Sequence, residues 1–291
     1  LGSCKEFGQK APAEDPAPVE ELPPAAAVPQ PPEVSGALWT SYDDSGEVAA
    51  NADHPNPRMR YKLIQSRVLD KNEVFQPLYP EVQKMTEAEY NRLKPLILEE
   101  SIPVVQEHIR NGRFSYEDLV RFFLYRIYTY ELDNSTTLNT IIALNPKLIE
   151  QARACDAALE ANPEVDRHPI FGMPVLLKDN INTEEMPTTA GAIALIGNRT
   201  GDAFIVERLK EKGALILGKV NLSEWAYYLC RGCPVGYSAV GGQTLNPYGR
   251  RVFETGGSSS GSGTAIAAGY AMAAVGTETS GSILSPSSQN S

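Results

Sequence analysis

Residues 256–288 place the strongest constraint on the fold of this chain. They read GGSSSGSGTAIAAGYAMAAVGTETSGSILSPSS, so two segments rich in glycine and serine flank a run of small, mostly apolar residues. A flexible Gly/Ser linker would not contain such a run, whereas a tightly packed helix would. The pattern predicts a loop, a buried helix and a second loop. This arrangement would bring serine hydroxyls and backbone N–H groups together, as a catalytic site requires.

Length and charge limit the classes of function. The chain has 291 residues, enough for one large domain or two modest ones and for an enzyme. Its formal net charge is −10. Nucleic acid and anionic membranes both need a basic face, so we expect neither as a general partner. No apolar run approaches the roughly 20 residues that span a bilayer, which predicts a soluble body.

The first four residues, Leu1-Gly2-Ser3-Cys4, match the lipobox of bacterial lipoproteins, although so short a pattern also occurs by chance. Residues 11–35 are rich in proline, alanine and acid, so we expect residues 1–35 to be a lipobox-like start and a disordered tether. Together these features predict a lipid anchor at Cys4 on a membrane surface. The protein would then lie in the cell envelope, in the periplasm or at the cell surface; without a lipobox, we expect it in the cytoplasm.

The next part of the chain is expected to have a structural role. Residues 36–80 have no sustained period and predict an irregular lead-in, with a short strand at residues 61–68. We assign residues 81–291 to one domain. A helix is expected from Thr86 toward Glu100, although Pro95 and Pro103 should break or kink the stretch between Thr86 and Gly112. Further helices are expected from Ser115 and over residues 146–161.

An α/β pattern follows the scaffold helices. Residues 170–177 read IFGMPVLL and predict a buried strand that ends at Lys178. A helix over residues 202–212, a strand over 214–218 and a short helix over 221–229 come next. This alternation predicts a sheet with helices on both faces. Active crevices of such sheets lie beyond the carboxyl ends of the strands, where Lys178 is expected.

The histidines argue against one common type of serine hydrolase. His54, His108 and His168 are the only three, and no motif surrounds any of them. A Ser-His-Asp triad is therefore unsupported, and a catalytic serine needs another base. Lys178 fits that role, because desolvation in a pocket lowers the pKa of a lysine and frees its lone pair. The alternative is a structural or surface lysine.

Five motifs occur in a fixed order: FGMPVLLKDNI, KVNLSEW, GGQTLNPYG, GGSSSGSG and GTETSGSI. They resemble the amidase signature family of serine hydrolases, over most of residues 146–291. The LLKDNI, NLSEW and GTET segments are similar to the bacterial peptide amidase branch, which removes the carboxy-terminal amide from peptides. The resemblance implies an α/β fold with a mixed, twisted central sheet, helices on both faces and an N-terminal helical segment.

The resemblance also implies a Ser-cisSer-Lys triad. Ser282 in TSGSI matches the nucleophile, Ser258 matches the bridging serine that follows a cis peptide bond, and Lys178 matches the base. Neutral Lys178 would draw a proton through Ser258 from Ser282 as Ser282 attacks the amide carbon. The same relay would protonate departing ammonia, and water would hydrolyse the acyl-enzyme.

The family forms its oxyanion hole with backbone N–H groups, which correspond here to those of Thr279, Ser280, Gly281 and Ser282. Ser280 stands where glycine is common, and Leu284 stands where arginine is frequent, a change expected to alter the surroundings of the site. Ser259 is expected to support the triad, and Glu278 to hold nearby loops.

Other interpretations of single motifs are weaker. GGSSSGSG could cradle a phosphate, but it lacks the GK[ST] ending of a P-loop. Cys230 and Cys233 could form a redox pair, half of a zinc site, a disulfide, or two free thiols beside the cleft. No second cysteine pair or histidine cluster accompanies them. We therefore expect neither a metal nor a cofactor.

Family members continue well beyond the nucleophile, whereas this sequence ends nine residues after Ser282. The resemblance therefore implies that residues 81–291 hold only the N-terminal part of an amidase domain, without much of the acyl-binding pocket. The predicted function is hydrolysis of a carboxamide in a peptide or small acyl amide. Two alternatives are a glutamine-dependent transamidase or fatty acid amide hydrolase, and a noncatalytic binding lipoprotein with the same fold.

Overall fold

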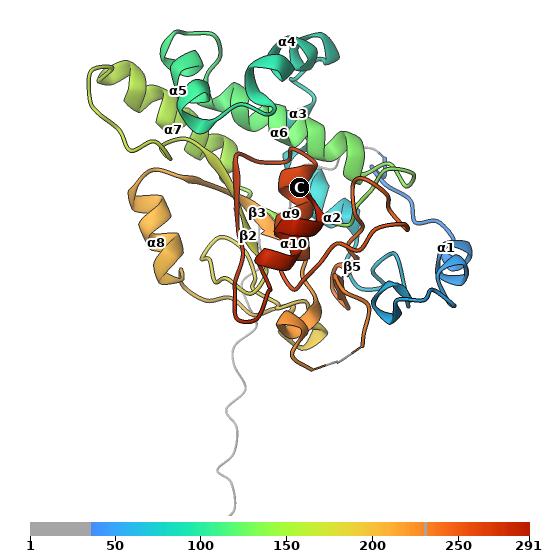
Figure 1. The fold of residues 1–291 in the computed structure, drawn as a ribbon. Coiled ribbons are helices and arrows are strands. Elements are labelled where there is room, and N and C mark those ends of the chain that lie inside the picture. Colours follow the sequence, from blue (N-terminus) through green and yellow to red (C-terminus); the bar gives the residue numbers. More distant parts are fainter. Residues whose placement is uncertain (1–35, 230–231) are drawn as a thin grey trace, which may run out of the picture. The chain divides into compact units, whose positions relative to one another are not determined.

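The computed structural model describes residues 36–229 and 232–291 (Figure 1). The lipobox at Cys4, the tether over residues 1–35 and Cys230 lie outside the described residues, so the lipid anchor and the envelope location stay predictions. Cys233 is in a disulfide. Within the described ranges, no helix is both long enough and apolar enough to cross a membrane.

Short helical turns come first, in the lead-in and the start of the helical segment. They are α1 (Ser45–Ala50), η1 (Pro57–Met59), α2 (Lys71–Phe75), η2 (Gln76–Leu78) and α3 (Tyr79–Val82), where η marks a 3-10 helix. Longer helices follow: α4 (Glu87–Ile97), α5 (Ile102–Arg110), α6 (Tyr116–Glu131) and α7 (Leu148–Ala161). The remaining helices are η3 (Ile193–Leu195), α8 (Phe204–Glu211), η4 (Glu224–Tyr227), α9 (Ser260–Ala267) and α10 (Leu284–Gln289).

The main sheet is mixed. Its strands are β1 (Ile141–Leu144), β2 (Pro174–Lys178), β3 (Leu215–Val220) and β6 (Ala273–Val275), in the order β1-β3-β2-β6. β2 runs parallel to β3 and β6, whereas β1 is antiparallel to β3. The parallel strands β2 and β6 therefore end at the same edge of the sheet. A separate hairpin pairs β4 (Tyr237–Ser238) with β5 (Gly242–Gln243).

Helices cover both faces of the sheet, as the sequence predicts. Side chains alternate along a strand, so Leu176 and Leu177 point to opposite faces. Leu176 packs in the large core with α6, α7 and α9, whereas Leu177 packs in a smaller cluster with Val206 of α8. Figure 1 shows α8 and α9 on opposite sides of β2 and β3. The sheet is thus buried on both faces.

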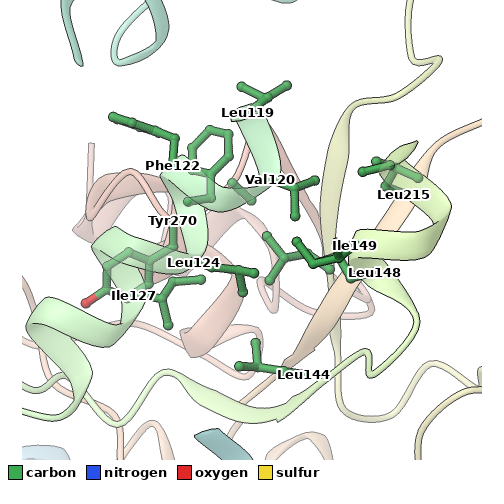
Figure 2. Packing of buried hydrophobic residues seen from close by; sticks show 14 of the residues in the cluster. Leu119, Val120, Phe122, Leu124, Ile127, Leu144, Leu148, Ile149, Leu215 and Tyr270 are labelled. Atoms are coloured by element: carbon green, nitrogen blue, oxygen red, sulfur yellow. The ribbon is translucent and has the colours of Figure 1, made fainter. Parts of the chain in front are cut away.

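The large core joins the N-terminal helical segment to the sheet. Figure 2 shows α6 side chains packed against residues of α7, β1 and β3, and against Tyr270 after α9. The helices begin where the sequence predicts. Thr86 accepts a hydrogen bond from Glu89 N–H, and Ser115 and Asp118 form a capping box at the start of α6. The chain breaks between α4 and α5, with Pro103 in the first turn of α5, but Pro95 lies inside α4, which continues to Ile97.

The prediction for residues 256–288 was only partly right. A helix lies between the two serine-rich loops, but α9 begins inside the first loop at Ser260 and ends at Ala267. The Ala-rich residues after it form β6, which pairs with β2. Helix propensity favours alanine, but the open edge of β2 supplies hydrogen bonds that override that preference here.

Two other local predictions were wrong. Residues 61–68 form no strand, because their backbone serves other partners: Ile64 and Gln65 N–H groups donate to the buried Asp44 carboxylate. The helix predicted over residues 221–229 is only the short turn η4. Trp225 has a left-handed backbone, and its N–H donates to the carbonyl of Ala190 at 2.9 Å, which ties the turn to another loop.

Candidate active site

The carboxyl end of β2 delivers Lys178 into the protein interior. Its side chain is fully buried, and Nζ donates hydrogen bonds to Ser258 Oγ at 2.7 Å and to Thr277 Oγ1 at 2.8 Å. Burial lowers the pKa of Lys178 to about 8, although the negative charge of Glu278 opposes the shift. A substantial fraction of Lys178 is therefore neutral slightly above neutral pH.

Ser258 joins the lysine to Ser282. The Gly257–Ser258 peptide bond is cis, as the resemblance implies. Ser258 Oγ accepts from Lys178 and donates to Ser282 Oγ at 3.0 Å. This direction of donation suits a protonated lysine. Hydroxyl groups both donate and accept, so with a neutral lysine the same three groups can donate in the opposite order, from Ser282 to Lys178.

Ser259 ties the two serine loops together. Its N–H donates to the carbonyl oxygen of Ser282 at 3.0 Å, and its Oγ donates to the carbonyl oxygen of Thr277 at 3.3 Å. Ser259 Oγ also lies 3.2 Å from the N–H of Thr277. Ser259 therefore binds both the backbone of Thr277, whose side chain contacts Lys178, and the backbone of Ser282.

Glu278 organises the loop that carries Ser282. Its carboxylate accepts backbone N–H bonds from four consecutive residues: Gly281, Ser282 at 3.0 Å, Ile283 at 2.5 Å and Leu284 at 3.1 Å. These hydrogen bonds, with that of Ile283 the largest cause, lower the pKa of Glu278 to about 2. The loop turns at Gly281, whose φ of +101° favours glycine.

The four N–H groups of the expected oxyanion hole fall into two pairs in the structure. The N–H groups of Gly281 and Ser282 are already used by Glu278, whereas those of Thr279 and Ser280 donate no hydrogen bond within residues 36–229 and 232–291. The sequence could not indicate this division, because it depends on where the Glu278 side chain folds back. Ser280 does not have a left-handed backbone, so its Cβ meets no strain at the position where glycine is common.

A buried ion pair fixes the residue after Lys178. Asp179 Oδ1 lies 3.2 Å from Lys219 Nζ, and both side chains are fully buried. Lys219 also donates to the carbonyl of Ile181 at 2.7 Å, and Asp179 accepts from the hydroxyl of Thr189. These contacts lock the backbone beyond β2, and removing either partner would leave an uncompensated buried charge.

Thr277 was missed by the sequence analysis. Its Oγ1 contacts Lys178 Nζ and also accepts from Asn180 Nδ2 at 3.1 Å. Thr277 follows β6 with one glycine between, so it is a polar residue at the same edge of the sheet as Lys178. This signal could not be used, because residues 273–275 were expected to be helical.

The three side chains of the hydrogen-bonded series differ in exposure. Lys178 and Ser258 are buried, whereas Ser282 is half-buried and lines an open cleft of about 800 Å³. The other residues that line it include Asn56, Pro57 and Arg58, then Ala226, Tyr227 and Tyr228, and then Thr277, Thr279, Ser280 and Gly281. Ser282 is therefore the member of the series that lies nearest to solvent and that a ligand in the cleft can reach.

Comparison with known proteins identifies the family. The family model described as Amidase matches residues 118–291, more than half of the chain. The chain belongs to the amidase family. The matched residues include Lys178, Ser258, Thr277 and Ser282.

Two solved structures share the fold of this amidase chain over part of their length. An amidase family protein from Bacillus anthracis str. Ames is 40% identical with a TM-score of 0.73, over 79% of this chain and 45% of that one. The native peptide amidase of Stenotrophomonas maltophilia is 42% identical with a TM-score of 0.62, over 66% of this chain and 39% of that one. A probable amidase of Arabidopsis thaliana is 40% identical over 67% of this chain and 38% of its own length. The chain thus spans less than half of the length of each of these relatives.

Proposed function

We propose that the full-length protein hydrolyses a carboxamide to a carboxylic acid and ammonia, acting on C-terminally amidated peptides or small acyl amides. The observation that carries this proposal is the hydrogen-bonded series Lys178–Ser258–Ser282, which opens into the cleft at Ser282. Membership of the amidase family and the similarity to a peptide amidase support the reaction class and the peptide substrate.

In the proposed mechanism, Ser282 Oγ attacks the amide carbon while its proton passes to Ser258 Oγ. The proton of Ser258 moves at the same time to neutral Lys178. As the tetrahedral intermediate collapses, the C–N bond breaks and the relay returns a proton to the nitrogen, which leaves as ammonia. Water, activated by the same relay, then attacks the ester on Ser282 and releases the acid.

The negative oxygen of the intermediate needs hydrogen-bond donors. With Glu278 bound to the N–H groups of Gly281 and Ser282, those of Thr279 and Ser280 are available for this task. Both residues line the cleft beside Ser282. We therefore infer that Glu278 shapes the nucleophile loop, while the two N–H groups before Gly281 stabilise the oxyanion.

The activity is expected to rise with pH and to level off above about pH 8. Lys178 acts as a base only when neutral, and burial lowers its pKa to about 8, well below the value of a lysine in water. At pH values well below 8, kcat/KM should fall about tenfold for each pH unit, as the neutral fraction does. Initial rates over a pH series check this, and a rate that does not change below pH 8 would contradict a lysine base with this pKa.

The function is tested by incubating the full-length protein with an amidated peptide, a small acyl amide and free glutamine, in separate reactions. We expect ammonia and the free acid in equal amounts from the first two. Ammonia from glutamine alone would instead favour the transamidase alternative. A folded protein that releases no ammonia from any of the three would overturn the proposal.

A further inference from the structure

The lead-in segment supplies one side of the active-site cleft. Asn56, Pro57 and Arg58 line the same cleft as Ser258 and Ser282, although they lie some 200 residues earlier in the sequence. Asn56 caps η1 by accepting the N–H of Arg58. The carbonyl of Arg58 accepts from Val235 N–H at 3.1 Å, which ties the turn to the body of the protein. The backbone of this cleft wall is therefore fixed.

The side chain of Arg58 is also oriented. Its Nη2 lies 2.9 Å from Glu254 Oε1, and Asn56 Nδ2 donates to the other oxygen of Glu254 at 2.9 Å. The guanidinium group lies over the ring of Tyr227, another residue that lines the cleft, 5.9 Å from its centroid. The Arg58 side chain nevertheless remains 41% exposed. An arginine has five N–H donors, so this one can bind a ligand while keeping Glu254.

The charges around Arg58 indicate what kind of ligand it would bind. Glu254 neutralises the guanidinium. A ligand carboxylate bound to the same guanidinium would be repelled by the Glu254 carboxylate. A neutral carbonyl oxygen accepts a hydrogen bond from the guanidinium without that repulsion. The surroundings therefore favour a neutral acceptor such as a peptide carbonyl.

The reaction determines which part of the substrate lies near Arg58. The leaving group of a primary amide is ammonia, so nearly all of the substrate other than the reacting nitrogen belongs to the acyl part. A cleft of about 800 Å³ is also far larger than a simple amide needs and is in the size range that encloses drug-sized ligands. Any contact that Arg58 makes with a carbonyl other than the reacting one is thus made on the acyl side.

We propose that Arg58 is a specificity-determining residue, which donates a hydrogen bond to a backbone carbonyl oxygen on the acyl side of the substrate. This inference rests on the proposed amidase function and narrows it to peptide amides. A small acyl amide without a second carbonyl would leave Arg58 without this contact. The site would then accept such an amide as a poorer substrate.

The test compares two amides that differ in one acylamino group, N-acetylphenylalaninamide and 3-phenylpropanamide, with the full-length protein. Hydrogen bonds to charged groups are worth about 1.5–3 kcal/mol. We therefore expect Arg58→Ala to lower the ratio of the two kcat/KM values by about tenfold or more. Arg58→Lys keeps one donor and should recover part of the ratio.

Arg60→Ala is the matched control. It removes the same charge two residues away, from an exposed side chain that does not line the cleft and that donates to the carbonyl of His54. The ratio should keep its unsubstituted value in this variant. An unchanged ratio in Arg58→Ala would overturn the inference while leaving the amidase function intact. Failure of the unsubstituted protein to release ammonia from either amide would overturn the function itself.

Discussion

Replacing Ser282 with alanine is expected to lower kcat/KM for amide hydrolysis by at least about 10⁴-fold. Ser282 Oγ is the exposed end of the series that begins at Lys178, and it is the atom proposed to bond to the amide carbon. In a well-studied serine protease, removal of the nucleophile costs about 10⁶-fold in kcat, which sets the scale. Ammonia release measured with an amidated peptide checks the prediction.

Ser282→Ala should leave the fold unchanged, because it removes one half-buried hydroxyl oxygen and keeps the backbone N–H that donates to Glu278. Thermal unfolding should therefore match that of the unsubstituted protein. Ser287→Ala is a suitable control, since Ser287 is exposed and does not line the cleft. Ammonia release that survives Ser282→Ala would show that another group attacks the amide.

Replacing Lys178 with methionine is expected to lower kcat/KM by a comparable factor. Lys178 contacts Ser258 directly, and methionine has a similar length without the nitrogen that takes the proton. The side chain is fully buried, so an apolar replacement also avoids an unpaired interior charge. The rise of rate with pH up to about 8 should disappear together with the base.

A variant that carries both Lys178→Met and Ser282→Ala tests whether Lys178 and Ser282 act together in the same step. If Lys178 serves only to activate Ser282, combining Lys178→Met with Ser282→Ala should lower the rate little further than either change alone. Lys84→Met, which replaces an exposed lysine that pairs with Glu81, should retain full activity. Independent, multiplicative losses in the double variant would contradict the relay.

The parts of the site that could be predicted depend on local signals. Lys178 follows an apolar strand, and Ser258 and Ser282 lie in glycine- and serine-rich motifs. The structure brings these three side chains into hydrogen-bond contact. The scaffold helices were also predictable, because Thr86 and Ser115 cap their own helices through residues only three positions away.

The features that could not be predicted depend on distant partners. β6 is a strand only because β2 offers it an edge, so Thr277 was not recognised as a contact of Lys178. The cleft wall at Arg58 depends on Glu254 and Tyr227, which lie far along the chain. The use of two N–H groups by Glu278 depends on side-chain placement alone. None of these contacts leaves a periodic or spacing signal.

Covalent labelling tests directly whether Ser282 is the activated nucleophile. A fluorophosphonate reacts with serines that are activated as nucleophiles, and peptide mapping by mass spectrometry locates the adduct. We expect one adduct, on Ser282, that is absent in Ser282→Ala and strongly reduced in Lys178→Met, because the proposed relay from Lys178 through Ser258 activates that hydroxyl. An adduct on another serine, or amide hydrolysis by a protein whose Ser282 stays unlabelled, would contradict it.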